Sequence, residues 1–463
     1  MKQFFTLVVL YMLVGCKTVG NDYQRPEINL PAQFSQAVVT EGLTLQNNWW
    51  VLFDDAKLTE LIEEASQRNP NVGLAVARIE EAEAAIRETG ASGLPTVELS
   101  ADTKRERVTE AGIFPVFASN PRSNYRFGFN AIQEIEFWGR LARATEASRA
   151  TMLATQYAKN VVMWSLSSLA AYHYLLVRSY DAQLGINQQN QKNSEASLAL
   201  AKHRLAGGVV SVLDVHQAQL VLDNLSFQAQ ELTRLRALSE HQLAILSGNL
   251  QLKLAVDHLA KMPISPMPPT GLPSDLLENR PDVRQSEQHL IAANANIGVA
   301  KAAFYPSISL TGALGSESIQ LGDILKSAAR IWSLGLNLNL PIFNVGRLDA
   351  RLDQASAKQK QALANYQITI QNAFREVNDA LVNVRQYRER EKLAISRQDT
   401  TQKMLNVVKN RYRSGYSGYL EVLEAQRSHH DATQAVIQSR ENVLIATVAL
   451  FKALGGGWQR ESN

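Results

Sequence analysis

The chain nearly lacks cysteine and carries no strong charge of one sign. Cys16 is the only cysteine among 463 residues, so no internal disulfide can form and any role for cysteine belongs to this residue. The net charge is +3 with 20% charged residues, which excludes the basic field that nucleic-acid binding needs. Beyond the first residues no run of 18 apolar residues occurs, which excludes a transmembrane helix. Later segments that enter a membrane would therefore have to do so as β-strands.

Proline is missing from two long stretches, Gly139–Gly207 and Gly346–Gly415. Because proline breaks helix interiors, each stretch can form one helix on the order of 100 Å long. Their surfaces are rich in Ala, Gln, Ser and Asn, which suits a tube wall that is wet on two sides. A solid coiled coil, the alternative, needs a sustained heptad seam, and none is present. The returning helices, and the shorter helices that can stack above them, are predicted at Val212–Ser247, Tyr419–Leu454, Pro70–Gly90 and Pro281–Ala303.

These stretches belong to an internal repeat, in which short motifs recur after about 210 residues, too long for a solenoid period. The recurring motifs include Asn69-Pro70-Asn71 with Arg280-Pro281-Asp282, Gly139-Arg140 with Gly346-Arg347, and Ala218-Gln219 with Ala425-Gln426. Two copies of one supersecondary unit favour a symmetric wall or tube over a single catalytic cleft. The predicted divisions are a signal peptide (1–15), a lipidated segment with a first helix (16–68), repeat 1 (69–248), a proline-rich equatorial linker (249–279), repeat 2 (280–457) and a tail (458–463).

Each repeat contains two candidate strands, in which apolar and polar residues alternate. They are predicted at Leu94–Ala101, Tyr125–Ile135, Pro306–Leu314 and Trp332–Ile342. In the last of them, Leu334, Leu336 and Leu338 share one face, opposite Gly335 and Asn337. Such alternation over about 9–11 residues, with aromatic residues at both ends, is typical of strands that cross a membrane as part of a barrel. A half-buried sheet of a soluble protein is the alternative.

Four strands are too few to close a barrel, since the smallest barrels have about eight. An open edge in lipid would leave backbone amides unpaired, so several protomers must pool their strands. A trimer would supply a 12-stranded transmembrane β-barrel, four strands per protomer, and a long α-barrel of 12 helical columns, and this α+β membrane fold is the class that we predict.

The first sixteen residues read as an export signal. Lys2 is followed by the apolar run Phe4–Val14, which is too short to span a membrane. The run Leu13-Val14-Gly15-Cys16 resembles the lipobox of bacterial lipoproteins, which implies a lipid on Cys16. Lys17 favours the outer membrane of a Gram-negative bacterium, by analogy with lipoprotein sorting there. An ordinary signal peptide that happens to contain a cysteine is the alternative.

Each long helix and its returning helix form a hairpin, and the turn between them contains glycine. Glycine can end the long helix in left-handed geometry. Ser211 or Gly418 can then cap the next helix, with an acid three residues later. A tight turn between helices is a complete local explanation; a functional role depends on the two turns of each protomer forming a ring at a closed tip. The site residues predicted there are Gly207, Gly208, Ser211, Val212, Leu213, Asp214, Gly415, Tyr416, Ser417, Gly418, Tyr419, Leu420 and Glu421.

No residue pattern points to catalysis, a cofactor or a metal. Gly455-Gly456-Gly457 lacks the Lys-Ser/Thr of a phosphate-binding loop. His429-His430-Asp431 is the only histidine cluster, and neighbours on a helix diverge by about 100°. We therefore expect these side chains on a solvated face, and we expect the chain to be no enzyme.

The chain resembles the TolC-type outer membrane factors, and in particular their lipoprotein (NodT/OprM-like) branch. The resemblance covers nearly the whole mature chain. It is carried by the lipobox, Trp49-Trp50 with Phe53-Asp54-Asp55, the segment Arg411–Gln426 and the ending Ala453–Trp458. It implies an α+β membrane channel-tunnel, a homotrimer whose β-barrel continues into a periplasmic α-barrel. It also implies that this homotrimer is the exit duct of a tripartite efflux pump, joined at the hairpin turns to a periplasmic adaptor and served by an inner-membrane transporter, most simply of the RND type.

The chain departs from that pattern at one position of the tip. Many relatives carry an aspartate two residues after the tip glycine, where it helps form a cation-binding ring, whereas this chain has Ser417. Two other functions stay open: a channel of the same build for an ABC-driven type I protein secretion system, and a lipid-anchored spacer without a pore. The lipobox favours efflux over secretion by family analogy, and the alternating strands argue against the spacer.

Overall fold

The computed structural model describes residues 18–34, 48–107, 109, 121–256 and 276–456. Cys16 and its lipobox, most of the proline-rich linker and the C-terminal tail lie outside these residues. The chain forms two compact units: residues 1–27, 78–155 and 286–366 make the first, and residues 28–77, 156–285 and 367–463 the second. Both units combine segments from the two halves of the sequence, so neither unit corresponds to one predicted repeat.

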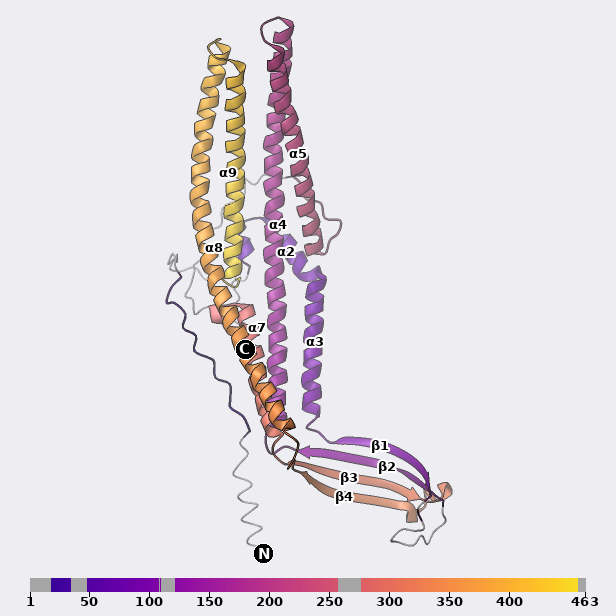
Figure 1. The fold of residues 1–463 in the computed structure, drawn as a ribbon. Helices are drawn as coiled ribbons and strands as arrows, with labels where there is room; N and C mark the ends of the chain where they lie inside the picture. The colour runs from indigo at the N-terminus through magenta and orange to yellow at the C-terminus, as the bar shows by residue number, and fades with distance from the viewer. Residues whose placement is uncertain (1–17, 35–47, 108, 110–120, 257–275, 457–463) are drawn as a thin grey trace. The chain divides into compact units, whose positions relative to one another are not determined.

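The element order helix, two strands, long helix, returning helix occurs once in each half of the chain (Figure 1). The two long helices have 67 residues each, and the two short helices that precede the strands have 22 each. No described helix is both long enough and apolar enough to cross a membrane. The helices are α3 (Pro70–Ala91), α4 (Arg140–Ala206), α5 (Val212–Ser247), α7 (Pro281–Ala302), α8 (Arg347–Arg413) and α9 (Tyr419–Ala453), with the shorter η1 (Trp49–Phe53), α2 (Ala56–Arg68), α6 (Leu276–Asn279), η4 (Leu321–Asp323) and η5 (Ser327–Ala329).

Four strands form one antiparallel sheet in the order β1-β2-β3-β4 (Figure 1). Among the described residues, no further strand lies beside the outer strands β1 and β4. The strand predicted at Trp332–Ile342 starts two residues late and ends three residues beyond β4, where Pro341 has no N–H to donate to a sheet. The strands are β1 (Thr96–Glu106), β2 (Arg122–Ile135), β3 (Ser307–Ser318) and β4 (Arg330–Asn339).

The register of the sheet places the apolar side chains of neighbouring strands directly opposite one another. Leu336 lies opposite Leu310, and Leu99 lies opposite Phe129. Residues that face each other across a pair share one face of the sheet, so the predicted apolar face runs across all four strands. It is uncovered in the single chain, since Leu336 keeps 68% of its surface exposed.

The second unit has a core built around η1 and α2. Trp49 and Phe53 are buried there, and the ring of Trp49 stacks on Phe451 of α9 at 5.3 Å. Asp55 caps α2, since one of its oxygens accepts the N–H groups of Lys57 and Leu58. Its other oxygen accepts the Tyr174 hydroxyl of α4 at 2.6 Å. The Trp-Trp and Phe-Asp-Asp motifs thus fix the N-terminal helix to the long helices.

The short helices begin where the returning helices end. The Asn69 side chain donates to the carbonyl of Leu246 in the last turn of α5 at 2.9 Å. In the second half, the Arg280 guanidinium donates to the carbonyl of Ala453, the last residue of α9, at 2.9 Å. Both contacts satisfy carbonyls that a helix end leaves free. α3 and α7 therefore begin directly at the ends of α5 and α9, and their stacking above these helices stays a prediction.

Candidate functional site

The first predicted turn joins α4 to α5 and has the expected glycine geometry. Gly208 has a φ of +71°, and the N–H of Val209 closes the turn on the carbonyl of Arg204 at 2.9 Å. Asp214 Oδ2 accepts the backbone N–H of Ser211 at 3.0 Å, three residues before it. This is the reciprocal bond of a capping box, so the turn is well defined by its own residues.

The second predicted turn joins α8 to α9 with the same closure. Gly415 has a φ of +80°, and the N–H of Tyr416 reaches the carbonyl of Arg411 at 2.9 Å. Gly418 is the N-cap of α9 and has no side chain with which to cap it. The half-buried Ser417 hydroxyl has no hydrogen-bond partner among the described residues.

Side chains from one hairpin contact the other just behind the turns. The Arg204 guanidinium of α4 donates to the Tyr412 hydroxyl of α8 and lies 4.8 Å from the centre of its ring. Tyr419 packs on the small apolar cluster of Leu198, Ala201 and Ala218. Burial raises the pKa of the Tyr419 hydroxyl, which therefore stays neutral. The structure thus brings the two predicted turns together through aromatic and cationic contacts.

The turns themselves present apolar side chains to solvent. Leu213 and Leu420 occupy equivalent positions, each the second residue of its helix, and are 60% and 55% exposed. Val209 and Tyr416 are more exposed still. Exposed apolar residues gathered at a turn indicate a contact surface for another molecule.

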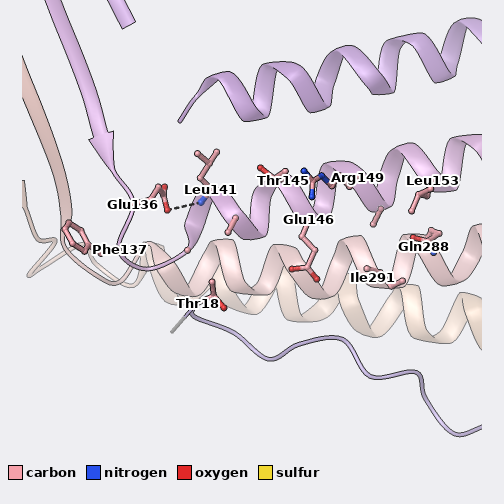
Figure 2. Close-up of a pocket in the computed structure, with 13 residues that line it drawn as sticks. Thr18, Glu136, Phe137, Leu141, Thr145, Glu146, Arg149, Leu153, Gln288 and Ile291 are labelled. Atoms are coloured by element: carbon pink, nitrogen blue, oxygen red, sulfur yellow. Dashed lines mark hydrogen bonds between the residues drawn. The ribbon is translucent and has the colours of Figure 1, made fainter. Parts of the chain in front are cut away.

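A second feature lies in the first unit, where α4 begins directly after the sheet. Glu136 caps this helix by accepting the N–H of Leu141 at 3.0 Å (Figure 2). Beside it a groove of about 760 Å³ is lined mainly by α4, with Thr18 and α7 contributing. Arg143 of α4 holds the segment after Thr18 through Asp22, at 2.7 Å. The N-terminal segment is therefore fastened to α4.

Two features were missed by the sequence analysis. Arg204 and Tyr412 occupy equivalent positions in the two halves, within His203–Gly207 and Arg411–Gly415, about one turn before the tip glycines. This equivalence was the available signal. The histidine pair was wrongly expected on a solvated face: His429 and His430 are half-buried, and His430 contacts the opposite hairpin. Only the packing of helices far apart in sequence shows this.

Known proteins match the chain over nearly its whole length. It is 32% identical to the solvent efflux pump outer membrane protein SrpC of Pseudomonas putida, over 99% of this chain and 98% of that protein. It is 33% identical to the cation efflux system protein CusC of Escherichia coli, over 98% of each. The solved structure of the Campylobacter jejuni CmeC outer membrane channel aligns with a TM-score of 0.88 and 25% identity, over 96% of each chain.

The same assignment comes from a comparison with protein families. The family described as outer membrane efflux protein matches residues 61–249 and 272–456, which include both turns and all four strands. The chain belongs to the outer membrane efflux protein family.

Proposed function

We propose that the chain is the outer membrane channel of a tripartite efflux pump and conducts solutes passively, without catalysis or a cofactor. The observation that carries this proposal is the agreement of sheet and hairpins with a solved outer membrane channel over 96% of the chain. Relatives named for solvent, toluene, antibiotic and cation efflux support an efflux role. The test is solute accumulation in cells that lack the chain: an organic solvent, an antibiotic or a copper salt should accumulate, and the restored gene should reverse it. Unchanged accumulation of all three would contradict the proposal.

The working form is proposed to be a homotrimer built from duplicated halves. The edge strands β1 and β4 need partners, and three protomers of four strands each would close a barrel of twelve. The helices also carry unpartnered apolar stripes. On α5, Leu220 and Phe227 lie seven residues apart and are exposed; on α8, Val382, Leu393 and Met404 recur every eleven. Both spacings keep residues on one face of a helix, as an interface between protomers requires.

Phe227→Glu is therefore expected to weaken trimer assembly. Phe227 is 80% exposed in the single chain, and its burial against a neighbour would contribute about 1.5–3 kcal/mol per interface. Sedimentation of the purified protein in detergent measures the trimer fraction. Ser226→Glu is the matched control, since it places the same charge on the neighbouring exposed residue outside the stripe. Equal trimer fractions for the two variants would show that this stripe is not an interface.

The partners proposed for the tips are a periplasmic adaptor and, through it, an inner-membrane transporter of the RND type. The support is the exposed apolar surface of the two turns, which include Leu213 and Leu420. In the same proposal, the contact of Arg204 with Tyr412 holds the hairpins together at rest.

The lipid anchor is proposed at Cys16, which lies four residues before Gly20, where Arg143 of α4 holds the N-terminal segment. Cells fed a radioactive fatty acid are expected to label the wild-type protein and leave Cys16→Ser unlabelled. Equal labelling of both would exclude Cys16 as the anchor. We expect Cys16→Ser still to insert, because the strands bury far more apolar surface than the acyl chains do.

A further inference from the structure

Two polar contacts join α4 to α9 between the hairpins of the second unit. Ser179 of α4 donates to the Glu441 carboxylate of α9, and Asn190 of α4 donates to His430 of α9. The two contacts are eleven residues apart on both helices. Eleven residues make about three turns, so the contacts lie on one face of each helix and form a seam.

His430 is bound by both helices of the opposite hairpin. Its Nδ1 accepts from the Asn190 amide at 2.6 Å, and its Nε2 lies 3.2 Å from Gln228 Oε1 of α5. The Asn190 amide nitrogen has no lone pair to offer, so Nδ1 must be the bare nitrogen and Nε2 must carry the proton. Gln228 Oε1 also accepts from the Asn187 amide at 3.3 Å. This arrangement fits the neutral ring and no other protonation state.

Protonation of Nδ1 would turn an acceptor into a donor facing the Asn190 donor. The remaining surroundings also disfavour a positive ring. Lys409 of α8 and Arg427 and His429 of α9 line the same cavity of about 500 Å³, against the single acid Asp431, and the α4 and α5 residues that line it are uncharged. Burial is the main cause that lowers the pKa of His430; His429 lowers it further and Asp431 opposes them. The cavity leaves water a route to the ring.

We propose that His430 is a pH-sensitive lock that holds the two hairpins together when neutral and releases them when protonated. The use of this lock, to keep the channel closed at rest, depends on the proposed function. Because the pKa is lowered in the locked state, the lock is complete above the ordinary imidazole value of about 6.5 and is lost as pH falls below it. Glu441 acts in the opposite sense, since burial raises its pKa and acid removes its buried charge.

The seam can be tested by thiol reactivity in the full-length protein. Cys16→Ser removes the only natural thiol. In this background, Ala201→Cys places a thiol in the buried cluster of Leu198 and Ala218, eleven residues beyond Asn190 on the same face of α4. Ala199→Cys is its exposed match on the same helix. The ratio of their maleimide reaction rates cancels the effect of pH on the thiol itself. The ratio is expected to rise as pH falls from about 7.5 to about 5.5, by up to about tenfold per unit between the ordinary imidazole value of about 6.5 and the lowered pKa of His430, below which it levels off.

Three substitutions test whether His430 causes the acid rise of the maleimide rate ratio. His430→Gln keeps one donor and one acceptor but cannot titrate, so its ratio is expected to stay low and flat. His429→Gln removes a ring that contacts Thr401 of its own hairpin, and this variant is expected to keep the acid rise. Asn190→Asp is expected to invert the dependence, because a carboxylate accepts from the protonated ring and tightens the seam in acid.

A flat ratio in the wild type, or an acid rise that persists in His430→Gln, would overturn the lock. Neither measurement requires solute to pass through the protein. Failure of the lock therefore leaves the channel proposal standing, and a failed channel proposal leaves the hydrogen-bond switch standing.

Discussion

Leu336→Arg is expected to reduce sharply the amount of assembled protein in outer membranes, whereas Asn337→Arg is expected to stay near wild type. Leu336 lies at the middle of β4 on the continuous apolar face, opposite Leu310, and is exposed in the single chain. If that face contacts lipid, an arginine there costs about 2–4 kcal/mol per protomer near the bilayer midplane. Asn337 points to the opposite face beside Ser309, where water is expected.

The two variants are matched in residue type and depth, and differ only in the face of the strand. The amounts of trimer in isolated outer membranes therefore show which face of β4 meets lipid. Equal losses for both would mean that the apolar face of this sheet does not meet lipid.

Leu213→Arg combined with Leu420→Arg is expected to abolish pump-dependent resistance while leaving the trimer intact. The two leucines are exposed at equivalent places in the two turns, so the arginines need not disturb the fold. A charge placed in an apolar contact loses the burial energy and adds an unpaired ion that must be desolvated. Crosslinking to the adaptor in cells should fall in parallel with resistance.

The control for the tip variant is Gln219→Arg with Gln426→Arg. These residues form a repeat-related pair further along α5 and α9 and add the same charge away from the turns. The control is expected to keep both crosslinking and resistance. A double-leucine variant that still crosslinks the adaptor and confers full resistance would exclude the turns as the docking surface.

The helix limits were predictable because the residues that end helices act locally. The sequence predicts α5 at Val212–Ser247 and the structure has the same limits, because glycine turns and capping residues act within a few positions of the helix end. The strand phases were equally accessible, since alternation depends only on nearest neighbours. The family follows from motifs that lie within single segments, such as Trp49-Trp50.

The contacts that complete the candidate site were less accessible. Arg204 with Tyr412, and Asn190 with His430, join helices more than 200 residues apart in the chain. Local patterns of polarity do not specify which faces of four long helices meet, because all of them carry polar residues all round. Docking at the predicted turn residues stays a prediction, for which the paired, exposed leucines are structural support.

Single-channel conductance in planar bilayers tests the central claim most directly. The purified protein is expected to insert and to show small, rarely open conductance, because in the proposed resting state the contact of Arg204 with Tyr412 holds the hairpins together. Arg204→Ala with Tyr412→Phe is expected to raise the conductance of the same trimer severalfold by releasing that contact. Inserted trimers that conduct no ions, both as wild type and with the released tips, would contradict a channel.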